Sequence, residues 1–170
     1  MLGVILLYVG IVLINNGVAR LFNINDKSVA IMNILVGCLS LICNIIILVQ
    51  GQFDGKMINF YLAGTGLLFA FTYLYAAFNT IFKLDTKLYG WYSLFVAINS
   101  IPAGMLCFNQ FGGDWKMGVI WLLWGILWLT SFIECVLKKT LGKFVGYLSV
   151  FEGIFTAWIP GLLILIGLWN

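Results

Sequence analysis

Six long apolar runs alternate with short polar breaks along almost the whole chain, and this pattern restricts the possible folds most strongly. The runs lie near 2–19, 29–49, 59–82, 90–108, 117–137 and 144–169. Each is close to the roughly 20 residues that an α-helix needs to cross the hydrocarbon core of a bilayer. The sequence therefore predicts an all-α membrane protein in which residues 1–170 form a single domain of six transmembrane helices.

The composition agrees with a membrane protein and excludes a soluble globule. Only 9% of the residues are charged and 63% are hydrophobic, whereas a soluble domain carries about 25% charged residues. The first apolar run begins at once, with no basic stretch before it and no A-x-A cleavage site after it. We therefore expect this run to be a permanent helix and not a signal peptide.

Basic residues are distributed unequally between the two sets of breaks. The breaks after the first, third and fifth runs hold seven of them, whereas the breaks after the second and fourth hold Lys56 and Lys116. Cytoplasmic loops are enriched in Lys and Arg, so both termini are predicted to be extracytoplasmic. The net charge of +3 is scattered over juxtamembrane loops and does not indicate nucleic-acid binding. The seven are Arg20, Lys27, Lys83, Lys87, Lys138, Lys139 and Lys143.

The chain has no histidine, which removes the usual metal ligand, general base and pH sensor. Its four cysteines contain no C-x-x-C pair and are expected to be free. We therefore expect no metal, no cofactor and no enzymatic activity.

The helices repeat in sequence. Three odd-numbered runs align as "ILLYVGIVL", "GLLFAFTYL" and "WLLWGILWL", with leucine in three columns and an aromatic column of Tyr8, Phe69 and Trp124. Three even-numbered runs begin "KSVAIMNILVG", "KLYGWYSLFVA" and "KFVGYLSVFEG". They share an opening lysine, small residues and a small polar column, which is Asn33, Ser93 and Ser149. The repeat predicts three parallel hairpins with quasi-threefold symmetry around a pore.

The aromatic columns are predicted to converge on the axis of this bundle. Phe69 and Tyr73 would match Trp124 and Trp128, with Leu6 and Leu13 on the first helix and Trp121 further out. The alternative is plain packing or lipid contact, but indole N–H groups facing lipid in mid-membrane would lack partners. A path walled by rings suits a small, planar, uncharged solute and excludes ions, which would lose their water without compensating ligands.

A few polar residues and prolines lie inside the apolar runs. Glu152 is the acid deepest in a run, and we predict either a pore-facing carboxylate or a structural glutamate. Glu134 is expected to pair with nearby lysines. Asn15 and Asn16 fit either a helix cap or a pore mouth, and Pro102 and Pro160 are expected to kink their helices.

Several of these segments resemble the AmiS/UreI family. They include "MLGVILLYVGIVLINNG", "TGLLFAFTYLYAAFN", "WYSLFVAINSIPA", "WLLWGILWLTSFIE" and "EGIFTAWIP", and together they span all six helices. The resemblance implies a passive channel for urea or short aliphatic amides in the bacterial inner membrane. It also implies a homo-hexameric ring with lipid at its centre, in which each protomer has its own pore. The pore residues that it implies are Leu2, Leu6, Leu13, Phe69, Tyr73, Trp121, Trp124, Trp128 and Glu152.

The chain departs from the acid-gated members of that family. Those members carry a longer outer loop and histidines that sense pH, whereas the outer breaks here are short and histidine is absent. We therefore expect a urea channel without an acid gate, which supplies a cytoplasmic urease, with Asp54 and Asp114 as weak modulators. The alternatives are an amide channel of the same family and a non-conducting membrane scaffold or sensor.

Overall fold

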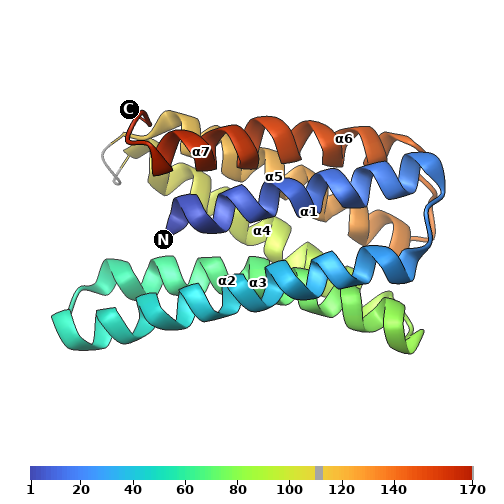
Figure 1. Ribbon diagram of the computed structural model, residues 1–170, viewed down its shortest axis with the longest axis horizontal. Coiled ribbons are helices and arrows are strands. Elements are labelled where there is room, and N and C mark those ends of the chain that lie inside the picture. Colours follow the sequence, from blue (N-terminus) through green and yellow to red (C-terminus); the bar gives the residue numbers. More distant parts are fainter. Residues whose placement is uncertain (110–112, 170) are drawn as a thin grey trace.

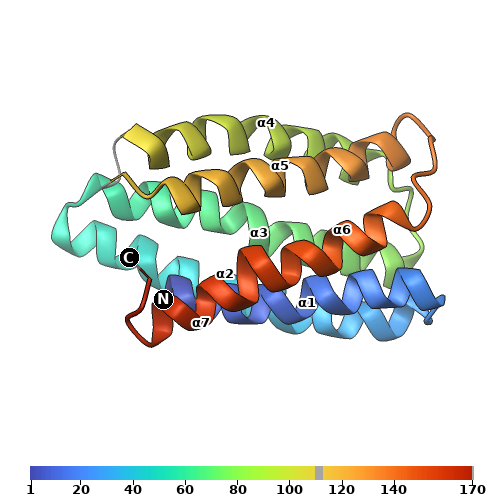
Figure 2. The ribbon, with the colours of Figure 1, turned by 90° about the horizontal axis from the view of Figure 1, so that it is seen from above.

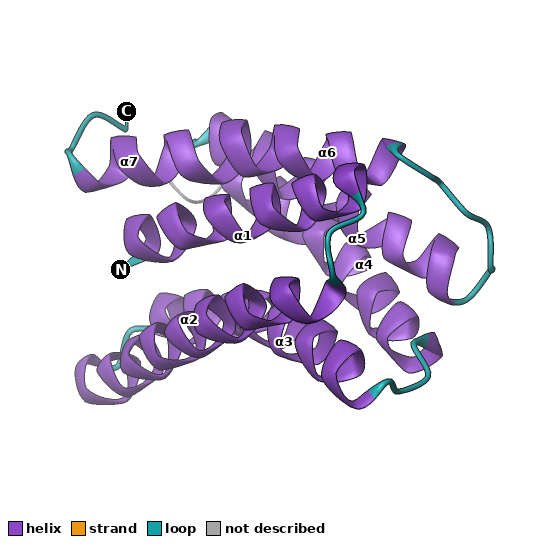
Figure 3. Ribbon diagram, turned by 45° about the vertical axis from the view of Figure 1, so that its right-hand side comes forward, coloured by secondary structure: helices purple, strands orange, loops and turns teal. Residues whose placement is uncertain are grey.

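The computed structural model describes residues 1–109 and 113–169, and this part of the chain is helical with no β-strand (Figure 1, Figure 3). Residues 110–112 of the last outer break, and Asn170, lie outside the described residues. Five apolar runs form one helix each: α1 (Leu2–Phe22), α2 (Asp26–Asp54), α3 (Met57–Phe82), α4 (Lys87–Asn109) and α5 (Trp115–Cys135). The sixth run forms α6 (Phe144–Glu152), a π-helical segment η1 (Gly153–Trp158) and α7 (Ile159–Leu165).

Among the described residues, six helical spans are long and apolar enough to cross a membrane, with the sixth counted as one span from Phe144 to Leu165. This confirms the prediction of an all-α membrane protein with six transmembrane helices. The largest difference in length concerns α2, which begins at Asp26 and continues to Asp54. The side chain of Asn25 caps its start by accepting a hydrogen bond from the Lys27 N–H at 2.9 Å, and Gly55 ends it with φ 67°. These polar end signals lie beyond the apolar run, so hydropathy alone predicted a helix that was too short.

The sixth span changes its hydrogen-bonding pattern in the middle. Pro160 has no N–H to donate to the residue four positions before it, and its ring crowds that carbonyl. The π-helical segment η1 ends two residues before Pro160 and absorbs the misfit while the helix continues into α7. The sequence predicts a kink at Pro160, and the structure shows how the chain accommodates it.

The two termini lie at the same end of the bundle, together with the α2–α3 connection (Figure 1). We name this the terminal end. The connections after α1, α3 and α5 lie at the opposite end, which we name the basic end because seven of the nine basic residues are there.

The closest helix pairs are α2 with α3, α4 with α5, and α1 with the α6–η1–α7 span (Figure 2). The sequence repeat instead groups α1 with α2, α3 with α4 and α5 with α6. Each even-numbered helix therefore packs mainly on the odd-numbered helix of the neighbouring repeat. The three close pairs surround the interior in which the candidate site lies.

Glycines allow α1 to approach the sixth span. A Cβ atom added at Gly10 would lie 2.7 Å from the Trp158 Cβ and 2.8 Å from the Trp158 backbone N. Gly3 and Gly17, seven residues to either side of Gly10, face Gly161 and Gly146 in the same way. Small residues at this spacing allow backbones to pack closely, which is how helices associate in membranes.

One column of the predicted repeat is out of register on α1. Tyr8, which the sequence aligned with Phe69 and Trp124, is 44% exposed, whereas its neighbour Val9 is fully buried. Moving α1 by one residue aligns Val9 with Phe69 and Trp124, and Leu13 with Tyr73 and Trp128, all of which are buried. Leucine misled the alignment because it is common on lipid-facing and interior surfaces of membrane helices alike.

Candidate functional site

An aromatic cluster occupies the centre of the bundle, and Phe69 of α3 is its hub. The Phe69 ring centroid lies 5.6 Å from that of Trp121, 4.6 Å from that of Trp124 and 4.8 Å from that of Trp128. Trp121 and Trp124 also meet edge to face at 5.3 Å. Edge-to-face and tilted contacts of this kind hold the rings at defined angles. All four rings are buried, so they face the interior and not the lipid.

Two threonines bind the indole N–H groups of this cluster. Trp124 donates to the Thr156 hydroxyl at 2.9 Å, and Trp128 donates to the Thr72 hydroxyl at 3.1 Å. Thr156 lies in η1, so the π-helical turn supplies one of these acceptors. The N–H groups of these two deeply buried tryptophans are therefore paired, and their rings are fixed in orientation.

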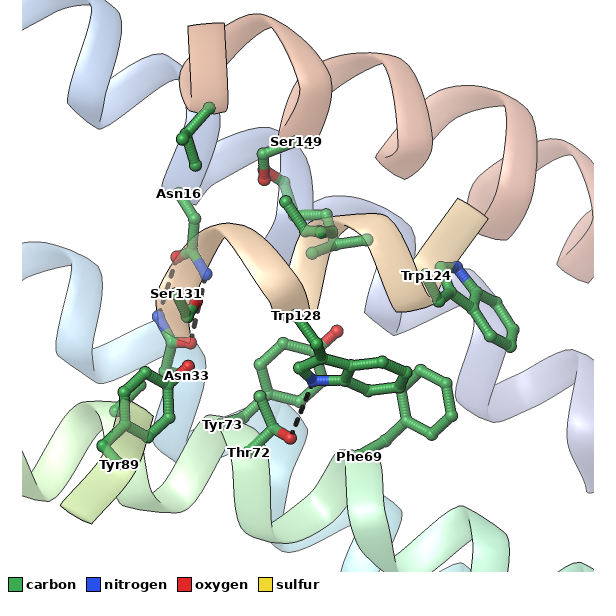
Figure 4. Close-up of a pocket in the computed structure, with 14 residues that line it drawn as sticks. Asn16, Asn33, Phe69, Thr72, Tyr73, Tyr89, Trp124, Trp128, Ser131 and Ser149 are labelled. Atoms are coloured by element: carbon green, nitrogen blue, oxygen red, sulfur yellow. Dashed lines mark hydrogen bonds between the residues drawn. The ribbon is translucent and has the colours of Figure 1, made fainter. Parts of the chain in front are cut away.

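Three cavities follow one another along the bundle. The cavity at the terminal end has a volume of about 490 Å³ and is lined by the first turns of α1, α3 and α5. The central cavity has a volume of about 140 Å³ and lies among the aromatic side chains (Figure 4). The cavity at the basic end has a volume of about 970 Å³ and is lined by the ends of α1 and α3 and the start of α2.

Shared residues connect the three cavities in this order. Phe69 and Trp124 line both the terminal and the central cavity and form the wall between them. Asn16, Ala76 and Tyr89 line both the central and the basic-end cavity. The cavities therefore form one series from end to end, with an aromatic wall on one side of the central cavity and a more polar boundary on the other.

The structure places eight of the nine predicted pore residues against this series. The terminal cavity is lined by Leu2, Leu6 and Trp121, and the central cavity by Leu13, Tyr73 and Trp128, while Phe69 and Trp124 line both. Glu152 lines none of the three. Its side chain is fully buried, and neither carboxyl oxygen has a hydrogen-bond partner among the described residues.

The sequence missed most of the polar lining of the central cavity. That lining includes Asn33, Thr72, Tyr89, Ser131 and Ser149. Asn33 and Ser149 belong to the small polar column of the repeat, which therefore carried a usable signal. Asn16 fits the predicted pore mouth because it lines two cavities, and the helix cap is instead Asn23.

Glu134 pairs with an arginine of α1, and the predicted pairing with nearby lysines is wrong. Its carboxylate accepts hydrogen bonds from both terminal nitrogens of Arg20 and from the Leu141 N–H at 2.9 Å. Arg20 also donates from Nε to the Gly142 carbonyl at 2.8 Å. These contacts tie the connection after α5 to α1 at the basic end. Arginine is preferred because its planar fork matches a carboxylate with two hydrogen bonds.

The central cavity combines aromatic walls with uncharged hydrogen-bonding groups. No charged side chain of the described residues lines it. An ion entering it would lose its hydration shell without gaining a counter-charge, whereas a small neutral solute could bond to amide and hydroxyl groups.

Six membrane-spanning helices around a series of cavities, whose central member is lined by uncharged side chains in the described residues, define a multi-pass membrane channel, not an enzyme. The sequence model of the AmiS/UreI family transporters matches residues 1–168, and the chain belongs to that family. This confirms the resemblance seen in the sequence and places the protein in the bacterial inner membrane.

Relatives of known type support the same assignment. The chain is 49% identical to the acid-activated urea channel of Helicobacter pylori (strain ATCC 700392 / 26695), with 99% of this chain and 100% of that protein aligned. The crystal structure of the urea channel from Helicobacter pylori matches with a TM-score of 0.91 and 50% identity, and both chains are covered completely. The chain is also 39% identical to a putative amidate substrates transporter protein of Mycolicibacterium smegmatis, over 99% of this chain and 78% of that protein.

Proposed function

We propose that the protein is a passive urea channel of the bacterial inner membrane that supplies a cytoplasmic urease. The observation that carries the proposal is the series of three cavities, whose central member is bounded by aromatic rings and free of charged side chains in the described structure. Urea is planar, neutral and rich in hydrogen-bonding groups, so it fits this lining. The similarity to the Helicobacter pylori urea channel favours urea as the permeant.

The narrow parts of the route are proposed to lie at the aromatic wall and at the residues on either side of it. Leu2, 44% exposed, would lie at the mouth, and Leu6 and Trp121 would lead to Phe69 and Trp124. Leu13, Tyr73 and Trp128 would guide the solute through the central cavity. We assign Glu152 a place behind this wall, where its backbone carbonyl accepts a hydrogen bond from Thr156 at 2.6 Å.

The orientation and assembly are part of the same proposal. The excess of Lys and Arg at the basic end places that end in the cytoplasm, so solute would enter from the terminal end. The exposed apolar residues on the outer faces of the helices, such as Leu35, Ile42, Phe95 and Phe155, suit contact with lipid or with neighbouring protomers of a homo-hexamer.

A short-chain amide channel is the second candidate, because the Mycolicibacterium smegmatis relative is described as a transporter of amidate substrates. Proteoliposomes under an inward gradient of urea or acetamide separate the candidates. We expect urea to enter faster than acetamide, and both faster than into empty vesicles. Faster acetamide entry would establish the amide channel, and rates equal to those of empty vesicles would support a non-conducting scaffold.

We propose that the channel has no acid gate, because it has no histidine to titrate near neutral pH. At the terminal end, the Asp114 carboxylate accepts hydrogen bonds from the Met117 N–H at 2.9 Å and from the Trp169 indole N–H at 2.8 Å. The Lys116 Nζ atom lies 5.0 Å from the centroid of the Trp169 ring. We expect urea flux at about pH 5 and at about pH 7.5 to agree within about threefold. A larger difference in the same vesicle preparation would show that the channel is gated by pH.

A further inference from the structure

Asn16, on the boundary between the central and basic-end cavities, bonds to Asn33, which lines the central cavity (Figure 4). Asn33 Nδ2 donates to Asn16 Oδ1 at 2.8 Å, and Asn16 Nδ2 donates to Asn33 Oδ1 at 3.2 Å. Asn16 lines both cavities, and Asn33, 3% exposed, lines the central one. A solute that moves between these cavities therefore meets this amide pair.

The amide pair offers the same chemistry as the proposed permeant. Each asparagine contributes a carbonyl acceptor and an NH₂ donor, and urea and short amides carry the same groups on a planar frame. Such a solute can replace one asparagine as the partner of the other. Each hydrogen bond that opens is then replaced by one of the same kind, so no buried polar group is left unpaired during passage.

A third asparagine lies further along the same series of cavities. Asn79 of α3 lines the basic-end cavity and is only 6% exposed. Neither its Nδ2 nor its Oδ1 atom has a hydrogen-bond partner in the described part of the chain. Buried amides without partners are rare in folded proteins, because the lost hydration is not repaid. A passing solute with both donors and acceptors would satisfy Asn79.

We propose that Asn33, Asn16 and Asn79 form an amide relay, which selects the permeant by exchanging hydrogen bonds with it. This inference rests on the proposed urea channel function and adds a second selection step to it. The aromatic wall selects flat, uncharged molecules, whereas the amide relay selects amide chemistry among uncharged molecules of similar size.

The test compares urea with ethylene glycol, a small uncharged solute that has hydroxyl groups and no amide. The variant Asn16→Ala/Asn33→Ala removes both partners of the pair together, so neither amide is left unpaired, and alanine cannot block the route. In proteoliposomes we expect the ratio of urea flux to ethylene glycol flux to fall by about fivefold or more, since two amide bonding positions are lost. Asn79→Ala should lower the ratio by a smaller factor.

The control variant is Asn99→Ala. Asn99 lines none of the three cavities and already donates to the Phe95 carbonyl at 2.8 Å, so the ratio should stay at its wild-type value. If the alanine pair does not assemble, Asn16→Leu/Asn33→Leu replaces it, because the apolar side chains can pack against each other.

The outcomes distinguish the relay from the channel function itself. The relay would be overturned if the ratio of urea flux to ethylene glycol flux were unchanged in the alanine or leucine double variant. An equal rise in both fluxes would also overturn it, because it would show that the asparagine pair only obstructs the route. Wild-type vesicles that take up urea no faster than empty ones would instead overturn the proposed function. A ratio that falls in the pair variant but not in Asn99→Ala would support the relay.

Discussion

Replacing Phe69 by alanine is expected to remove the discrimination against solutes larger than urea. Phe69 contacts three tryptophan rings and forms the wall between the terminal and central cavities together with Trp124. Without the ring these cavities should merge. We expect glycerol flux in proteoliposomes to rise about tenfold, which corresponds to a barrier lowered by about 1.4 kcal/mol. Urea flux should change less, because the route already admits urea.

A matched control lies on the same helix. Phe71 is 45% exposed and lines none of the three cavities, so Phe71→Ala should leave glycerol flux at the wild-type level. Truncating a buried phenylalanine costs about 3–5 kcal/mol in soluble cores, so Phe69→Leu serves as a milder variant. Wild-type glycerol exclusion in both assembled Phe69 variants would show that the aromatic wall does not control passage.

Gly10→Val is expected to destabilise the native fold strongly. The added Cβ would lie within 2.8 Å of both the Cα and the backbone N of Trp158, and backbone atoms cannot rotate away as a side chain can. The helices would have to separate, and overpacking of this kind costs about 1–3 kcal/mol and occasionally more. We expect a strongly reduced yield of monodisperse protein in mild detergent and a markedly lower midpoint of thermal unfolding.

Gly64→Val provides the comparison for this substitution. Gly64 lies on α3, and a Cβ added there would meet nothing within 4 Å. This variant makes the same chemical change at an open position and should behave like wild type. If Gly10→Val and Gly64→Val are equally stable, the glycine contacts between α1 and the sixth span do not hold the bundle together.

The sequence was sufficient to predict the six membrane spans and the interior location of the aromatic residues on α3 and α5. Hydropathy reveals spans because every backbone polar group in a bilayer must be satisfied within the helix, which makes long apolar runs unambiguous. The aromatic columns were informative because large rings at matching positions are uncommon by chance. Phe69, Tyr73, Trp124 and Trp128 are buried as the repeat predicted.

The remaining features depend on tertiary packing, which the sequence pattern does not encode locally. Glu152 lines none of the three cavities. The sequence could not predict its orientation, because this depends on how the sixth span is arranged around η1. The alignment grouped Tyr8 with buried rings although Tyr8 is 44% exposed, because leucine columns carry little information inside a membrane. Asn79 gave no signal, since a single asparagine in an apolar run does not reveal whether its amide has a partner.

The most direct test of the whole account measures urea and potassium movement in the same vesicles. Wild-type protein is reconstituted with an inward urea gradient and an outward potassium gradient, and both are followed together. We expect urea to enter well above the rate of empty vesicles while the potassium gradient persists as long as in empty vesicles, because the central cavity offers an ion no compensating charge. Urea entry accompanied by rapid loss of the potassium gradient would contradict an uncharged route bounded by aromatic rings.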